Sequence, residues 1–263
     1  MGHRNLAAAN RLLKPAFLSA CLAVLAPAAA WAGPPFVTDD PEPVEYRHWE
    51  LDLASQYANN EDGKEGTLPH FEANYGIVPD VQLHLLVPLA FVHPNDEPTM
   101  YGLGDTEVGV KYRFLHETDT TPQVGIFPLV HVPSGDSDRG LGGGQVPAFL
   151  PVWAQKSLGP WTTYGGGGYW SNPGEGNKNF WQLGWLVQRD LSKALTLGAE
   201  VFYFGKDMDD GRDRTGYNIG GFYNLSENHH ILFSAGSDIA GDNRFSSYLG
   251  YQYTFGPREA EEK

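Results

Sequence analysis

Residues 248–255 read Tyr-Leu-Gly-Tyr-Gln-Tyr-Thr-Phe, and every second side chain is apolar or aromatic. Successive side chains of a β-strand point to opposite faces, so a period of two indicates a strand with one apolar face. That face carries Leu249, Tyr251, Tyr253 and Phe255, opposite Tyr248, Gly250, Gln252 and Thr254. The segment therefore predicts an amphipathic strand near the C-terminus.

The same alternation recurs along the chain and predicts twelve strands. It is clearest at 46–57, 70–77, 81–91, 106–115, 181–188, 195–203 and 245–255, and weaker at 123–132, 146–155, 161–170, 215–224 and 229–237. Polar loops rich in Gly, Asp and Asn alternate with mostly shorter connections between the strands. The polar loops are expected at 58–67, 93–105, 133–145, 171–178, 205–214 and 238–244. An even number of strands joined in this way indicates an all-β, antiparallel up-and-down meander.

Periodicity alone fits both a soluble β-sandwich and a transmembrane β-barrel, because the two differ only in which face meets solvent. Aromatic residues near the ends of the apolar faces, Trp49, Tyr57, Tyr75 and Trp181, are typical of the girdles at membrane interfaces. The opposite face of each predicted strand carries both small and charged residues, as expected for side chains that face the polar lumen of a barrel. We therefore predict a closed antiparallel transmembrane β-barrel of about twelve strands.

Composition excludes other classes of protein. The chain has 263 residues and a mean hydropathy of −0.36, which argues against several apolar helical spans of about 20 residues. Its formal net charge of −14 argues against nucleic acid as a partner, because phosphate contacts need a basic surface.

Residues 1–32 have the three-part layout of a secretory signal peptide. Arg4, Arg11 and Lys14 precede an apolar run, and Ala30-Trp31-Ala32 offers small residues before a cut at Gly33. Such a cut removes the single cysteine, Cys21, and leaves 15 basic against 32 acidic residues. Two alternatives are a lipidated Cys21, which would leave a short apolar region, and an uncleaved membrane anchor.

The mature chain divides into three parts. Residues 33–44 are Pro-rich and acidic, and four prolines cannot join a central sheet, so we expect an extended lead-in. The barrel is expected over 45–255, followed by a charged tail at 256–263. Whether the lead-in enters the lumen does not follow from the sequence.

Two resemblances sharpen this interpretation. Gly250, Tyr253 and Phe255 resemble the last-strand signal by which bacterial outer-membrane barrels are recognised for insertion, although Tyr248 stands where a polar residue is usual and the tail extends past Phe255. Four further segments resemble the outer-membrane family named for the meta-pathway of phenol degradation: GPPFVTDDP at 33–41, GLGDTEVGVKYRF at 102–114, HVPSGD at 131–136 and YGGGGY at 164–169. The resemblance covers most of residues 33–255 and implies an outer-membrane barrel that passes small compounds, aromatic ones among them. It supplies no catalytic residues.

Ten ionisable residues are predicted to face the lumen: His48, Glu50, Asp52, His70, Glu72, His84, Glu107, Lys111, Arg113 and Glu200. They could tune what passes through an open lumen, or they could form a salt-bridge network that plugs a narrow barrel. Both interpretations stay open at this point.

Three functions remain: a passive channel, a structural or surface-interaction barrel, and an outer-membrane hydrolase. The chain has no G-x-S-x-G elbow, and nothing distinguishes Ser246, Ser247 and His230 as catalytic. We predict no enzyme activity, no catalytic residue, no metal site and no cofactor. The expected partners are outer-membrane lipid and lipopolysaccharide, the barrel-assembly machinery and a small solute.

Overall fold

The computed structural model describes residues 34–257. The predicted signal peptide, its cleavage site and Cys21 lie outside the described residues, as does most of the tail. Among residues 34–257, no helix is long and apolar enough to cross a membrane.

Within residues 34–257, fourteen strand segments form one antiparallel sheet that closes on itself. They are β1 (Trp49–Asn59), β2 (Gly63–Val78), β3 (Val81–Pro94), β4 (Met100–Leu103), β5 (Thr106–Leu115), β6 (Gln123–Ile126), β7 (Leu129–Val132), β8 (Ala148–Leu158), β9 (Trp161–Ser171), β10 (Phe180–Asp190), β11 (Leu195–Phe204), β12 (Arg214–Asn224), β13 (His229–Ala240) and β14 (Phe245–Phe255). Because β4 and β5 both pair with β3, and β6 and β7 both pair with β8, each couple is one interrupted barrel strand. The predicted all-β barrel of twelve strands is confirmed.

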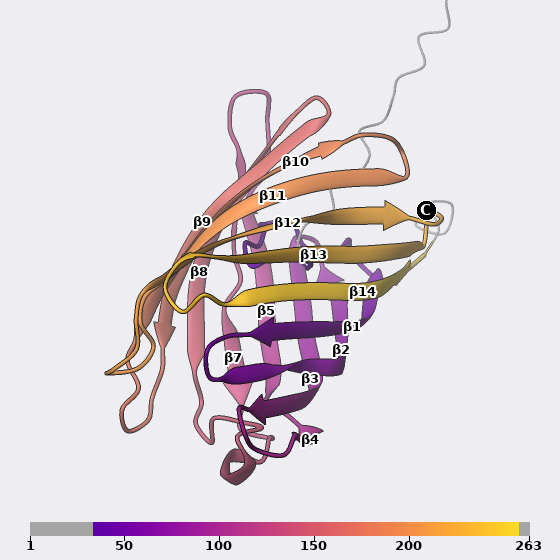
Figure 1. Cartoon of the computed structure of the whole chain (residues 1–263). Coiled ribbons are helices and arrows are strands. Elements are labelled where there is room, and N and C mark those ends of the chain that lie inside the picture. The colour runs from indigo at the N-terminus through magenta and orange to yellow at the C-terminus, as the bar shows by residue number, and fades with distance from the viewer. Residues whose placement is uncertain (1–33, 258–263) are drawn as a thin grey trace, which may run out of the picture.

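The barrel closes where its first and last strands meet. β1 pairs with β14 over its whole length, from Trp49 opposite Phe255 to Asn59 opposite Phe245. Figure 1 shows indigo β1 beside yellow β14. Trp49 and Phe255 therefore lie at the same end of the barrel, which we call the terminal end; the opposite end is the loop end.

Some predicted boundaries are wrong by a few residues. The first strand begins at Trp49 rather than residue 46, because Tyr46 makes a parallel bridge to Gly76 and Arg47 has a φ of 65°. The loops expected at 58–67 and 238–244 shorten to 60–62 and 241–244, since β2 and β13 extend further than the alternation suggested.

Side chains alternate between an apolar exterior and a mixed interior. Leu83, Leu85, Trp185 and Leu249 are 40–63% exposed on the outside, whereas Gln82, His84 and Glu200 are at most 7% exposed on the inside. A soluble sandwich would bury the first set, so that alternative is wrong; an apolar exterior suits lipid.

Aromatic rings gather near both rims of the exterior. At the terminal end Trp49 stacks on Tyr75, with ring centroids 4.4 Å apart, and lies 6.4 Å from Phe255. At the loop end Tyr57 stacks on Phe91, and Tyr169 packs edge-to-face on Trp181. The predicted girdle residues thus lie in two bands, as expected where a barrel passes through two membrane interfaces.

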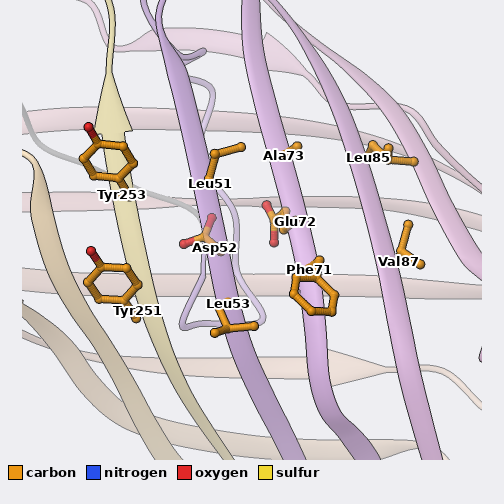
Figure 2. Close-up of a pocket in the computed structure, with 10 residues that line it drawn as sticks. All are labelled: Leu51, Asp52, Leu53, Phe71, Glu72, Ala73, Leu85, Val87, Tyr251 and Tyr253. Carbon is orange, nitrogen blue, oxygen red and sulfur yellow. The ribbon is translucent and has the colours of Figure 1, made fainter.

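A shallow apolar groove follows the closing seam on this outer surface (Figure 2). Its outward side chains are Leu51, Leu53, Phe71, Ala73, Leu85, Val87, Tyr251 and Tyr253. Asp52 and Glu72 border it through their backbone, because they alternate with the outward residues and are buried on the inner side. The groove therefore belongs to the lipid-facing surface and not to the lumen.

The face assignment makes a direct prediction for stability. Leu85 is 43% exposed in the middle of the apolar face of β3. We expect Leu85→Arg to cost roughly 2–4 kcal/mol of folding free energy, the usual cost of a cation facing lipid at midplane depth. Gln56→Arg is the matched control, since Gln56 is exposed and pairs with the inward Tyr248. An equal loss of folded, heat-modifiable protein for both variants would contradict the assignment.

Candidate functional site: the lumen and its strap

Residues 34–44 run through the interior of the barrel, and we call this segment the strap. Thr38 and Asp40 are completely buried, and Pro41 is less than 2% exposed. The strap bonds to β13 through Pro35, to β11 through Val37 and Thr38, and to β3 through Val44. The extended lead-in predicted from the prolines is therefore part of the lumen.

A carboxylate on β11 holds the middle of the strap. The backbone N–H groups of Val37 and Thr38 donate to the two carboxylate oxygens of Glu200, at 2.8 and 2.7 Å. Asn218 on β12 donates a third hydrogen bond to Glu200, at 2.6 Å. These bonds satisfy a carboxylate that is only 2% exposed and would otherwise be costly to bury.

Cations of β5 hold the acidic half of the strap. Lys111 Nζ lies 2.9 Å from Asp39 Oδ1 and 3.8 Å from Asp40 Oδ1, and it also lies over the ring of Phe127, 4.9 Å from its centroid. Further along, Glu42 lies 3.6 Å from Arg113 and accepts from Gln123. The acidic side chains of the strap thus pair with Lys111 and Arg113, the two cations that were predicted to face the lumen.

Two smaller features let the strap fit. Phe36 packs against an apolar cluster of Ala54, Phe222, Leu232 and Tyr248 on the opposite wall. Gly184 of β10 faces the strap, and a methyl group there would overlap Thr38 Oγ1. The strap is therefore anchored by an apolar contact near one end and by hydrogen bonds and ion pairs along its length.

A polar network covers the wall formed by β1, β2, β3, β5 and β7. Asn74 donates to both Glu50 and Glu72, at 3.1 and 2.9 Å, and its carbonyl oxygen lies 2.8 Å from His84 Nδ1. His84 Nε2 lies 3.0 Å from Glu107, whose other oxygen lies 2.9 Å from His131. Four predicted lumen residues, Glu50, Glu72, His84 and Glu107, therefore meet in one chain of hydrogen bonds.

The remaining predicted lumen residues are placed separately. Asp52 is buried opposite Glu72, and His70 contacts Thr67 and the ring of Tyr248. His48 is not on a barrel strand: it precedes β1 at the terminal rim, where its ring approaches the carbonyl of Tyr46. The prediction that His48 lies on a barrel strand is wrong, because β1 begins one residue later; its role in lining the lumen stays a prediction.

Arg113 lies near the terminal end of the lumen and is tied to a turn. Its guanidinium donates twice to Asp80 between β2 and β3, at 3.0 and 2.8 Å, and His116 approaches the other oxygen. Burial alone would raise the pKa of Asp80, but the hydrogen bonds and charges of Arg113 and His116 together hold this pKa below its usual value. Arg113 thus holds the β2–β3 turn at the terminal end through Asp80, and it also contacts the strap through Glu42.

Two of the sequence motifs interlock at the loop end. Asp105 accepts backbone hydrogen bonds from Gly135 and Gly143, at 3.0 and 2.7 Å. Ser134 Oγ accepts from the Thr106 N–H and donates to the Gly104 carbonyl. Leu141 of the same loop is 4% exposed and lies near the inward Gly102, so these bonds fold the 133–147 loop over the mouth of the lumen.

The charges of the lumen are unbalanced. The cations of the lumen, Lys111, Arg113 and Arg214, are outnumbered by carboxylates of the strap and the inner wall: Asp39, Asp40, Glu42, Glu50, Asp52, Glu72, Glu107 and Glu200. No group of three or more His, Cys, Asp or Glu among residues 34–257 has the arrangement of a metal site. The lumen is therefore an acidic environment for whatever enters it.

Ser246 and His230 do not form a nucleophile and base. On the paired strands β13 and β14, Ser246 lies opposite Gly236 and His230 lies opposite Gln252, six residues further along. Six residues of strand span about 20 Å, far beyond hydrogen-bond reach. Ser246 instead donates to Asn218, and His230 contacts Asn224.

The fold resembles several solved barrels, all at low sequence identity. A COG4313 outer membrane channel from Pseudomonas putida F1 superposes with a TM-score of 0.65 at 16% identity, covering 82% of this chain and 98% of that one. The KdgM porin in complex with disordered oligogalacturonate gives 0.56 at 10% identity, covering 78% and 99%. The NanC porin gives 0.55 at 12% identity, covering 77% and 98%.

Sequence comparison assigns the family. No curated protein matches the chain. The profile of the family described as "Putative MetA-pathway of phenol degradation" matches residues 57–255, which is more than half of the chain and includes three of the four segments quoted above. The chain belongs to the putative MetA-pathway of phenol degradation family.

Proposed function

We propose that this protein is a passive channel of the bacterial outer membrane for small uncharged or cationic compounds. One observation carries the proposal: a closed barrel turns an apolar surface outward and encloses ionisable side chains. Lipid accepts the first surface, and water or a polar solute accepts the second. The likeness to solved channels and porins supports this function.

The strap supports one alternative. Because residues 34–44 occupy the middle of the lumen, a structural or surface-interaction barrel without transport is the second candidate. Under either function the loop end would contact lipopolysaccharide. The barrel-assembly machinery would recognise the last strand through Phe255. A hydrolase is disfavoured, because its candidate nucleophile and base lie about six residues of strand apart.

Solute flux separates the two candidates. Purified, heat-modifiable protein is reconstituted into liposomes, which are diluted into isotonic arabinose, glycine or gluconate. A channel with an acidic lumen passes arabinose and glycine faster than gluconate, because carboxylates on the wall repel the anion. If folded protein leaves swelling in arabinose and glycine at the protein-free rate, the structural barrel is the better account.

The inner-wall carboxylates should set ion preference. Glu50 and Glu72 share Asn74 as a donor, and neither makes a hydrogen bond to the strap among the interactions seen in residues 34–257. We expect Glu50→Gln with Glu72→Gln to lower the cation preference in reversal-potential measurements while strap and barrel stay in place, since amides retain hydrogen-bonding capacity. A large rise in conductance instead would mean that these carboxylates hold a closed plug together.

A further inference from the structure

Aromatic rings line the inner wall toward the loop end, where a barrel lumen is ordinarily polar. We call Phe149, Trp170, Phe180, Phe202 and Phe204 the aromatic arc; they come from β8, β9, β10 and β11. Phe149 stacks on Trp170 with centroids 4.7 Å apart and an interplanar angle of 8°, and Trp170 stacks on Phe180 at 5.9 Å and 18°. Phe204 follows at 6.4 Å from Phe180, and Phe202 at 5.8 Å from Phe204.

Strand alternation places these rings inside the barrel. Phe180 has the same parity as the inward Gln182, while Trp181 between them is 55% exposed on the lipid side. Phe202 and Phe204 likewise share the parity of the buried Glu200. These apolar rings face the lumen and not the lipid, so contact with the membrane does not explain why aromatic residues occupy these positions.

Solvent reaches the middle of the arc. Trp170, Phe180 and Phe204 are partly exposed although they point inward, whereas the deeper inward residues Trp153 and Tyr164 are each 1% exposed. Packing of a closed core would have covered all of them to a similar degree. Three adjacent rings therefore present accessible surface inside the barrel, on the loop side of the strap.

Polar neighbours hold the rings in position. The indole N–H of Trp170 donates to Gln182 at 2.9 Å, and Gln182 in turn contacts the carbonyl of Val37 in the strap. At the far end the guanidinium of Arg214 lies over Phe204, 4.7 Å from the ring centroid. A surface that is already ordered loses little entropy when it binds a ligand.

We propose that the aromatic arc is a solute-binding strip that takes the planar rings of uncharged aromatic compounds entering from the loop end. Offset or edge-to-face contact with a ring gives an aromatic solute an attraction that a saturated ring of equal size lacks. The acidic lumen beyond the strip disfavours aromatic carboxylates. This inference rests on the proposed channel function for its biological meaning, but binding to the strip can be measured without transport.

The test compares two alcohols of matched size in detergent-solubilised, folded protein. Binding of benzyl alcohol and of cyclohexylmethanol is measured by titration calorimetry, with empty micelles subtracted. The variant Phe180→Leu with Phe204→Leu keeps apolar volume and removes two rings. Trp181→Leu, one residue away on the lipid face, is the matched control.

The expected result is tighter binding of benzyl alcohol than of cyclohexylmethanol, reduced about tenfold in the double variant and unchanged in Trp181→Leu, since the double variant loses two ring contacts and the control loses none. Equal binding of the two alcohols, or equal losses in the double variant and the control, would overturn the strip. Ring-selective binding without flux in liposomes would contradict the channel function but support the binding strip. Flux without ring-selective binding would support the channel function but contradict the binding strip.

Discussion

Deletion of residues 34–44 is expected to raise the single-channel conductance severalfold. The strap fills the middle of the lumen, where Thr38 and Asp40 are completely buried against the walls. Its removal exchanges packed protein for water, so that ions meet a wider path. The barrel should stay folded, because the ladder that closes β1 on β14 does not involve the strap.

A second variant separates the strap's anchors from its mere presence. Replacing residues 34–44 by a Gly/Ser segment of equal length removes Phe36, the acidic side chains and the prolines but retains the chain. We expect a conductance between those of the wild type and the deletion, with larger current noise, because a flexible segment samples many positions. Unchanged conductance in both variants would mean that ions do not pass by the strap at all.

Removal of the Lys111 charge should release the strap. Lys111→Met leaves the buried Asp40 and the partly buried Asp39 without their cation, and breaking a buried ion pair on one side costs roughly 3–5 kcal/mol. That cost falls on the docked state, so the released population should rise about a hundredfold or more. Maleimide labelling of a Thr38→Cys variant reports release directly, since Thr38 is fully buried when docked and the sequence has one other cysteine, at position 21.

The control is the double variant Lys111→Met with Asp39→Asn. Neutralising Asp39, the nearer partner, removes one of the two unpaired carboxylates, so labelling of Cys at position 38 should fall part of the way back toward the wild-type rate. If the single and double variants label at the same rate, the ion pair does not hold the strap. Both measurements are made on protein whose heat-modifiability shows a folded barrel.

The architecture could be predicted because lipid imposes a simple rule on every strand. Runs such as Val81-Gln82-Leu83-His84-Leu85 alternate without interruption, and one face of each barrel strand must be apolar. Errors arose at strand ends, where no such rule applies: Gly63–Val78 extends into a segment whose alternation is weak, and the first strand begins at Trp49, three residues later than the pattern suggested, which leaves His48 outside it.

The lumen was predicted only in part, because polarity was the sole guide to the inner face. That guide found Glu50, Glu72, His84, Glu107, Lys111 and Glu200, but it passed over the inward aromatic rings. Phe180 and Phe204 share the parity of Gln182 and Glu200, so extending the alternation by one step would have found them.

The strap was harder to predict. Thr38 and Asp39 carry no periodic signal, and their partners Glu200 and Lys111 lie far away in the sequence. Prolines indicate that such a segment stays out of a sheet, but they do not indicate where it lies instead.

The most direct test of the channel is the current across a planar bilayer that contains the purified, folded wild-type protein under a KCl gradient. The acidic lumen predicts discrete conductance steps and a reversal potential on the cation-selective side. Its magnitude should be modest, since Lys111 and Arg113 lie among the carboxylates. A silent bilayer in which heat-modifiable protein is shown to be inserted would contradict the channel, and an anion-selective reversal potential would contradict the acidic lumen as the conducting path.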